Sequence, residues 1–245
     1  MLTAILVASV LLGGAYALMA MGLTLQYGVA RIMNLATGET LMGAAFGSFW
    51  LFTAMQLSPL LSLLFIVPLA FAINWAIYRW LLTPLVRRAK NQGMLEVDSI
   101  LATFGLLFVI EGAMLAGFGG NYYSYSFLAE PVTLLGHSFG LNRVVAFGVA
   151  ALMALALYLG LNRTRYGTAI RAVAVDPVAA GLVAIDVPRA AAFAFALGGA
   201  LTACGGSLLS IFITFNASMG VVFTMKALII VIMGGVGDPR GAVIA

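Results

Sequence analysis

The chain has 245 residues, of which 63% are hydrophobic and only 8% are charged, whereas a soluble domain usually carries about 25% charged residues. This composition excludes an ordinary soluble domain and indicates a protein that is embedded in lipid. The net charge of +4 does not indicate nucleic-acid binding, because eight of the twelve Lys and Arg residues cluster in two loops, as membrane topology would place them.

The scarcity of reactive residues limits the chemistry that the chain can perform. Cys204 is the only cysteine and His137 the only histidine, so an intrachain disulfide is impossible and a histidine-based metal site is not expected. The sequence has no GxxxxGK[ST], HExxH or CxxC motif, and the glycines of VIMGGVGDPRGA (residues 231–242) lack the spacing of a dinucleotide-binding loop. We therefore predict that the chain is not an enzyme and binds no cofactor of its own.

Long apolar stretches predict an all-α polytopic membrane protein. A helix of about 20 apolar residues crosses roughly 30 Å of hydrocarbon. Seven such spans are expected within a single transmembrane domain, residues 1–245, and the first is expected to be retained because no basic leader precedes it. The predicted spans lie near residues 3–25, 39–56, 59–82, 99–119, 143–161, 189–213 and 222–237.

Basic residues flank the connections that follow the third and the fifth predicted spans. By the positive-inside rule, both connections are cytoplasmic. The segment 120–142 then lies outside, where its tyrosines, Pro131 and glycines suit an interfacial loop with a short hairpin, and alternation places the N-terminus outside as well. The basic residues are Arg79, Arg87, Arg88 and Lys90 in the first connection and Arg163, Arg165, Arg171 and Arg189 in the second.

Two weakly polar segments interrupt the helical pattern. GVARIMNLATGET follows the first span and TFNASMGVVFTMKA follows the sixth, and both contain Asn, three residues, then Gly: Asn34 to Gly38 and Asn216 to Gly220. An odd number of spans, five, lies between these breaks, so they would sit in oppositely oriented halves, which is the arrangement of an inverted repeat. The alternative is two unrelated turns in which Asn and Gly do ordinary turn work.

Irregular backbone at membrane depth is shielded from lipid and usually lines a cavity. We therefore predict that the breaks line the route of a small polar solute, with free helix N–H groups facing that route. The alternative is structural: Thr37 caps the second span and Glu39 lies favourably on the dipole of its first turn. The predicted pathway residues are Asn34, Thr37, Gly38, Glu39, Asn216 and Gly220.

Two further features lie inside the spans. Glu111 and Lys226 are ionisable groups at membrane depth, where either pairing or solute contact is expected. Small residues at Gly43–Gly47 and Gly198–Gly206 are expected to let helices approach closely.

The stretch 162–188 is basic, partly apolar and punctuated by proline. Tyr166–Val173 is expected to form one short helix, and Asp176 followed by Pro177 predicts the start of a second that ends near Ala184. Val178 and Leu182 share a face of that second helix and form an apolar ridge. Because a short helix is marginal in water, the ridge needs lipid headgroups, its own bundle or a partner protein, and the residues alone leave these choices open.

Three motifs resemble one transporter family. YGTAIRAVAVDPVAAGLVAIDVPRAAAFAFALGGALTACGGSLL strongly resembles the cytoplasmic loop and following helix of the branched-chain amino acid ABC-transporter permeases of the LivH type, in the LivH/LivM family. GLTLQYGVARIMNLATGETLMGAAFGSF resembles the early motif of that family, and MGVVFTMKALIIVIMGGVGDPRGA its late one. The chain departs from the family at Thr37, where histidine is common, and in ending before the last membrane helix of the family, which we expect to be missing here.

The resemblance implies a permease subunit of a bacterial importer in the cytoplasmic (inner) membrane. Two permeases, here this chain with a LivM-like partner, form the pathway for branched-chain or related amino acids. Two ATPase subunits bind ATP and Mg²⁺ and drive it, and an extracytoplasmic binding protein delivers the solute. Residues 166–184 would dock in an ATPase groove, with these coupling residues: Tyr166, Gly167, Arg171, Asp176, Pro177, Val178, Ala180 and Leu182.

Other functions remain open from the sequence. A permease of the same family could carry urea or short amides. An ion-coupled secondary transporter has similar inverted repeats and broken helices. A membrane partner that transports nothing would explain the sparse charges within the spans.

Overall fold

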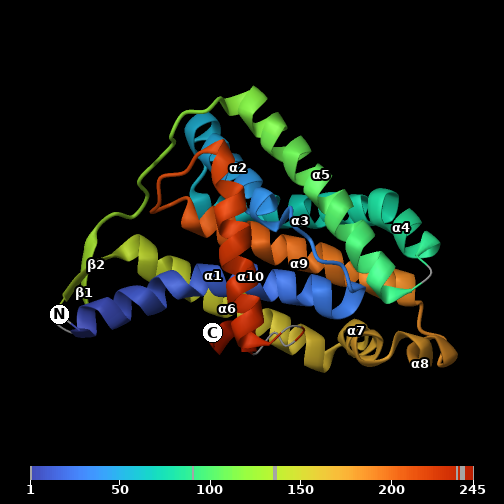
Figure 1. Cartoon of the computed structure of the whole chain (residues 1–245). Helices are drawn as coiled ribbons and strands as arrows, with labels where there is room; N and C mark the ends of the chain where they lie inside the picture. Colours follow the sequence, from blue (N-terminus) through green and yellow to red (C-terminus); the bar gives the residue numbers. More distant parts are fainter. Residues whose placement is uncertain (1, 90, 135–136, 236, 238–240, 245) are drawn as a thin grey trace.

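A computed structural model describes residues 2–89, 91–134, 137–235, 237 and 241–244. The described chain is almost entirely helical (Figure 1), which confirms the predicted all-α class. The helices are α1 (Leu2–Ala30), α2 (Thr37–Met55), α3 (Pro59–Ile77), α4 (Thr83–Arg88), α5 (Gln92–Phe118), α6 (Leu141–Arg163), α7 (Arg165–Val175), α8 (Pro177–Leu182), α9 (Val187–Leu209), α10 (Gly220–Gly234) and α11 (Gly241–Ile244). A π-helical turn, Tyr78–Leu82, joins α3 to α4, and a 3₁₀ turn, Ala217–Met219, precedes α10.

Among the described residues, six helices are long and apolar enough to cross a membrane. They coincide with six of the seven predicted spans, and the predicted span 39–56 forms α2, which lies outside this set of six. The third span extends past its predicted end at residue 82, because the π-helical turn carries the helix on into α4. The six segments are Leu2–Ala30, Pro59–Arg88, Gly93–Phe118, Leu141–Arg163, Val187–Leu209 and Ala217–Gly234.

Local sequence signals set several helix ends. Ser58 accepts a hydrogen bond from the backbone N–H of Leu61 and is followed by Pro59 at the first helical position of α3. Asp186 does the same for α9, with its carboxylate 3.1 Å from the N–H of Arg189. Such caps satisfy donors that the helix itself leaves free.

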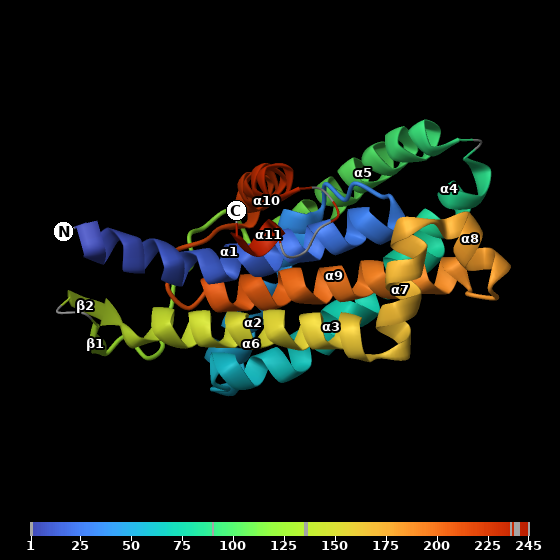
Figure 2. The ribbon, with the colours of Figure 1, turned by 90° about the horizontal axis from the view of Figure 1, so that it is seen from below.

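The α9 helix is the centre of the bundle. In its most apolar stretch 89% of the residues are buried, against 17% for α5 and for α6. It packs against α1, α2 and α3, and Figures 1 and 2 show these helices around it. Because α5 and α6 leave most of their apolar surface uncovered, that surface faces lipid or another chain.

Small residues make the contact between α1 and α9. A Cβ atom on Gly22 would lie 2.4 Å from the carbonyl oxygen of Gly198, and a Cβ on Gly205 would lie 2.9 Å from that of Ala15. The earlier residue of α1, Ala15, meets the later residue of α9, Gly205, and the later Gly22 meets the earlier Gly198. The two helices are therefore antiparallel. The expected close packing at Gly198–Gly206 is thus confirmed. In Gly43–Gly47, Gly43 itself meets no atom within 4 Å, whereas Ala44 is buried and its carbonyl accepts from Ser207 of α9 at 3.4 Å.

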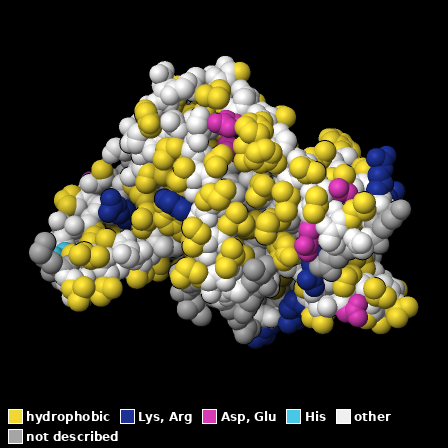
Figure 3. All heavy atoms as spheres, viewed as in Figure 1, with side chains coloured by type: hydrophobic (Ala, Val, Ile, Leu, Met, Phe, Trp, Pro, Cys, Tyr) yellow, Lys and Arg dark blue, Asp and Glu magenta, His cyan; other side chains and the backbone are white. Residues whose placement is uncertain are grey.

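The two ends of the bundle differ in character. The N-terminus lies beside an antiparallel hairpin of β1 (Pro131–Leu134) and β2 (His137–Gly140), in the register Pro131↔Gly140, and Thr3 Oγ1 lies 3.1 Å from His137 Nε2. This hairpin confirms the one expected in the outer segment. The opposite end carries α4, α7 and α8 (Figures 1 and 2). Figure 3 shows hydrophobic side chains over the face between the ends and most of the charged ones gathered toward α4, α7 and α8.

Candidate functional site

The two breaks in the helical pattern lie against each other. The first covers the non-helical residues 31–36 between α1 and α2, and the second covers residues 210–219 between α9 and α10. A Cβ atom on Gly38 would lie 1.8 Å from the carbonyl oxygen of Gly220. The starts of α2 and α10 are therefore in backbone contact, and the two Asn-x3-Gly motifs that are far apart in sequence form one site.

Hydrogen bonds of Asn34 and Thr37 hold the first break in shape. The Asn34 Oδ1 accepts from the N–H of Ala36 at 3.0 Å, and its Nδ2 donates to Gln26 Oε1 at 3.1 Å. Gln26 in turn donates to the carbonyl of Phe195 in α9 at 3.0 Å. Thr37 does not cap α2 as expected, because it is already the first residue of the helix, and its hydroxyl donates to the Asn34 carbonyl at 2.7 Å.

Thr224 of α10 forms hydrogen bonds with the first break and with the start of α2, and the sequence analysis did not identify it. Its hydroxyl oxygen accepts from the N–H of Gly38 at 2.9 Å and lies 3.1 Å from the carbonyl of Leu35, to which it can donate. The side chain is buried. The sequence could have indicated Thr224, because it lies one helical turn after Gly220 and therefore on the same face of α10.

Glu39 and Asn216 keep polar atoms without partners. Glu39 is 0% exposed, and neither of its carboxylate oxygens has a hydrogen-bond partner among the described residues. The buried Oδ1 of Asn216 likewise has none. The carboxylate lies directly on Gly220, where a Cβ atom would come within 2.1 Å of Oε1. The first turn of α2 favours a negative charge at Glu39, but it does not satisfy the side-chain oxygens.

Lys226 and Glu111 do not form an ion pair with each other. Instead, Lys226 Nζ donates to the Tyr16 hydroxyl at 3.2 Å and lies 5.2 Å and 5.3 Å from the ring centroids of Tyr16 and Phe223. These contacts fix α10 across α1 and give the lysine charge a partner in the aromatic rings.

A hydroxyl cluster that the sequence analysis missed lies where the outer segment meets the second break. The Tyr125 hydroxyl is 2.8 Å from Ser210 Oγ and 3.3 Å from Ser48 Oγ, which is 3.0 Å from Ser62 Oγ. Burial raises the pKa of Tyr125 above its usual value, because a phenolate there would be desolvated. The phenol therefore stays protonated at neutral pH and ties the outer segment to the bundle. The sequence could have indicated this cluster, because residues 122–126 read YYSYS and carry five hydroxyl groups in a row.

The segment 162–188 forms the two expected short helices, α7 and α8. Asp176 Oδ1 accepts from the N–H groups of Val178 and Ala179 at 2.8 and 3.1 Å, and Pro177 takes the first position of α8. The ridge points outward, since Val178 is 75% and Leu182 84% exposed. Of the other predicted coupling residues, Ala180 is buried inward, whereas Tyr166 is exposed and stacks on Phe193 with ring centroids 5.7 Å apart.

Backbone and side-chain contacts join α7 to the bundle. A Cβ on Gly167 would lie 2.4 Å from the carbonyl of Gly160, so only glycine fits there. Arg171 donates to Asn162 Oδ1 at 3.1 Å. Arg31, which lies in the first break with a positive φ of 55°, donates to the carbonyl of Ala174 in α7 at 3.1 Å. The segment with the exposed ridge is thus bonded directly to the first break.

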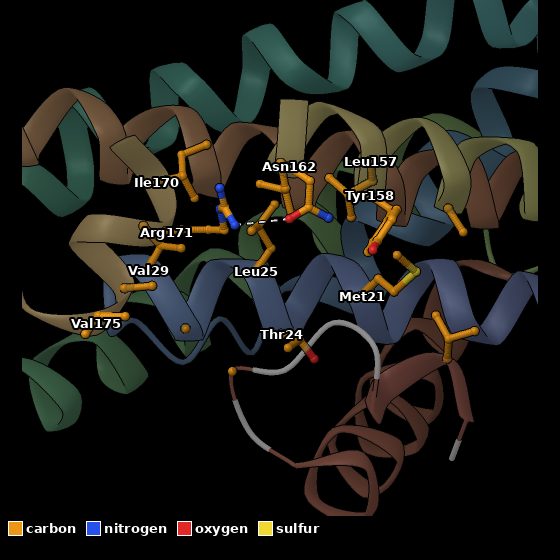
Figure 4. Close-up of a pocket in the computed structure, with 16 residues that line it drawn as sticks. Met21, Thr24, Leu25, Val29, Leu157, Tyr158, Asn162, Ile170, Arg171 and Val175 are labelled. Carbon is orange, nitrogen blue, oxygen red and sulfur yellow. Dashed lines mark hydrogen bonds between the residues drawn. The ribbon is translucent and has the colours of Figure 1, made fainter. Parts of the chain in front are cut away.

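A cavity of about 510 Å³ opens between α1, α6 and α7. Figure 4 shows Arg171 of α7 and Asn162 of α6 pointing toward each other among the lining residues, with apolar side chains such as Leu25 and Leu157 around them. None of the predicted pathway residues lines it. Among the described residues there is also no group of three or more His, Cys, Asp or Glu side chains that could hold a metal ion.

Comparisons with known proteins agree over nearly the whole chain. Residues 5–245 match the family described as branched-chain amino acid transport system / permease component. The chain is 29% identical to the high-affinity branched-chain amino acid transport system permease protein LivH of Escherichia coli (strain K12), over 96% of this chain and 79% of that protein. It is 28% identical to the probable branched-chain amino acid transport permease protein LivH of Methanocaldococcus jannaschii, over 98% and 76%.

A partial similarity extends to a different solute. The autoinducer 2 import system permease protein LsrC of Enterobacter sp. (strain 638) is 32% identical over 58% of this chain and 41% of its own length. No solved structure matches the chain.

Proposed function

Because the chain belongs to the family of branched-chain amino acid transport system permease components, we propose that it is the permease subunit of an ATP-binding-cassette importer. The proposed solutes are branched-chain or related small polar amino acids, since relatives that match nearly the whole chain are named for that transport. The chain forms half of the translocation pathway as one permease domain, residues 1–245. It has no ATPase site of its own.

The match of residues 5–245 to the permease family carries this proposal. Its coupling route is supported by the hydrogen bond from Arg31 in the first break to the carbonyl of Ala174 in α7. Residues 162–188 act as the cytoplasmic coupling segment. Their exposed ridge of Val178 and Leu182 provides an apolar docking surface for an ATPase subunit. Rigid-body movement of the ATPases would be passed through α7 and Arg31 to the break and so to α2.

The solute route runs at the contact of the two breaks. Movement of α2 relative to α10 separates Gly38 from Gly220 and exposes the buried polar groups between the helix starts. Glu39, Asn216 and the glycine backbone then face the solute. Asn34 and Thr37 contribute by keeping the first break in shape through their bonds to Ala36 and to each other.

The proposed assembly contains four kinds of subunit. A second, LivM-like permease covers apolar surface that α5 and α6 leave open. Two ATPase subunits bind ATP and Mg²⁺, so this chain needs no cofactor. An extracytoplasmic binding protein delivers the solute at the end that carries the hairpin.

The apolar ridge provides the test of this assembly. We expect the double substitution Val178→Asp and Leu182→Asp to abolish recovery of the ATPases with the tagged permease, because two charges replace the exposed apolar contact. Membrane insertion should be unchanged, since both side chains lie outside the spans. The measurement is the amount of ATPase that co-purifies after detergent extraction.

The matched control keeps the ridge apolar. Val178→Leu with Leu182→Met should retain the ATPases at the level of the unsubstituted chain. If the aspartate variant also retains them, the ridge is not the docking surface and the proposal fails.

An ion-coupled secondary transporter is the second candidate, favoured by the antiparallel α1 and α9 that each lead into a broken segment. Uptake into vesicles separates the two functions. The importer requires ATP and the ATPases, whereas the secondary transporter follows an imposed ion gradient without them. Testing urea and short amides in the same vesicles distinguishes the other solutes that the family resemblance allows.

A further inference from the structure

Glu39 and Asn216 both keep buried side-chain oxygens without partners among the described residues, at or near the start of α10. Glu39 begins α2 and packs its carboxylate on Gly220, and Asn216 lies four residues before that glycine. Glu39 is fully buried, and both of its oxygens and the Oδ1 of Asn216 have no partner among the described residues. The contact of the breaks therefore holds a buried carboxylate without donors, and a further acceptor without a donor lies four residues before Gly220.

A buried carboxylate of this kind is costly. Charges that leave water are stabilised only by an opposite charge and by hydrogen bonds, and no described Lys or Arg forms an ion pair with Glu39. Lys226 on α10 is occupied by Tyr16 and Phe223. Ionisable groups retained at membrane depth default to functional roles, so a cationic group that enters the site in transport would supply the partner that the described residues do not provide.

The chemistry of the acceptors identifies that partner. The nearby donors are already used, because the N–H of Gly38 bonds to Thr224 and the hydroxyl of Thr37 bonds to the Asn34 carbonyl. A buried carboxylate, with the acceptor oxygen of Asn216 four residues before the glycine on which it packs, suits a small group that carries positive charge and several N–H donors. An ammonium group has three donors and one charge, which matches this set.

We propose that Glu39 and Asn216 form the subsite that receives the α-ammonium group of a zwitterionic amino acid during transport. This inference rests on the proposed function and names the chemistry of its solute. In the structure the subsite is closed, because Gly220 leaves no space even for a Cβ atom beside the carboxylate. The subsite opens when α10 withdraws from α2, so the solute meets Glu39 only in the transporting state.

The test uses the complete importer in proteoliposomes, with radiolabelled leucine as the probe. Glu39→Gln keeps the shape of the side chain and removes its charge. We expect at least a tenfold lower rate of ATP-driven leucine uptake at saturating binding protein. Assembly and the apparent melting temperature of the complex should be unchanged or higher, because a buried unpaired charge has been removed. Asn216→Ala should lower uptake by a smaller factor.

The control is Asp98→Asn, which removes a partly exposed carboxylate in the first turns of α5, outside both breaks and outside the hairpin, and should leave uptake unchanged. Wild-type uptake by the Glu39→Gln importer would overturn the subsite while leaving the proposed function intact. Absence of ATP-driven leucine uptake by the unsubstituted importer would count against the proposed function itself.

If the Glu39→Gln chain does not assemble, a second variant tests whether Glu39 contacts the solute. Glu39→Asp keeps the charge but withdraws the carboxylate by one methylene group. Normal assembly with reduced leucine uptake supports a contact with the solute. Normal assembly with unchanged uptake, or loss of assembly in this variant too, assigns Glu39 a purely structural role and overturns the proposal.

Discussion

At the scale of single residues, a few glycines decide how closely the helices approach. Gly22 and Gly198 bring the backbones of α1 and α9 together, and Gly38 and Gly220 do the same for α2 and α10. Inside a membrane, lipid tails are as apolar as leucine, so helix association depends on such close packing rather than on the hydrophobic effect. Gly43, by contrast, meets nothing within 4 Å and contributes no contact of this kind.

This difference gives a prediction with an internal control. Gly22→Val should lower the apparent melting temperature of the detergent-extracted permease, because overpacking of a tight contact costs about 1–3 kcal/mol and the clash here is with backbone. Gly43→Val introduces the same side chain into open space in α2 and should change the melting temperature little. Equal effects of the two substitutions would mean that the α1–α9 contact is not tight.

At the scale of the elements, the broken helices and the coupling segment form one connected unit. Arg31 leaves α1 in a left-handed conformation and turns toward α7, where it bonds to Ala174. The same break leads directly into α2, whose start is fastened to α10 by Thr224. In the proposed importer, a displacement of α7 would therefore be passed to the site by these short bonded steps.

The Arg31 bond can be removed without touching the ridge or the pathway. A hydrogen bond from a charged donor contributes about 1.5–3 kcal/mol. Loss of that energy corresponds to a factor of roughly ten or more. We expect Arg31→Ala to lower ATP-driven uptake by about that factor while the ATPases still co-purify and hydrolyse ATP.

The control for Arg31 is Arg189→Ala, which removes an exposed ion pair with Asp186. Exposed pairs contribute little, so uptake should stay near that of the unsubstituted importer. If Arg31→Ala transports normally, coupling passes through other contacts of α7, such as that of Gly167 with α6.

At the scale of the whole molecule, the chain is a multi-pass protein of the cytoplasmic membrane, and the family match confirms the resemblance seen in its motifs. The N-terminus and the hairpin share one end, and α4, α7 and α8 share the other. The positive-inside rule assigns the second end to the cytosol.

This orientation can be measured with single cysteines. In a chain whose buried Cys204 is replaced by alanine, Tyr122→Cys should react with a membrane-impermeant maleimide applied from outside the cell. Val183→Cys should react only after the membrane is opened. Both positions are exposed, but Tyr122 belongs to the outer segment between α5 and β1, whereas Val183 directly follows α8. Labelling of both from the same side would contradict the orientation.

Much of the fold was predictable because span length, charge bias and caps are local properties. Six of the seven predicted spans coincide with long apolar helices, and Asp176 with Pro177 begins α8 where expected. The failures concern contacts between distant segments. Thr37 was expected to cap α2 but bonds to Asn34, and Thr224 and Gln26 were not recognised, because their partners are set by helix packing.

The sequence by itself determined that the chain crosses the membrane repeatedly, which segments remain irregular and which loop carries an exposed apolar ridge. Each of these follows from the composition of a continuous stretch and the cost of placing polar backbone in lipid. Only the tertiary structure decided that the two breaks touch at Gly38 and Gly220, that Glu39 has no partner among the described residues, and that Arg31 bonds the first break to α7. These are long-range juxtapositions, and they depend on how the antiparallel helices α1 and α9 pack, which no local stretch encodes.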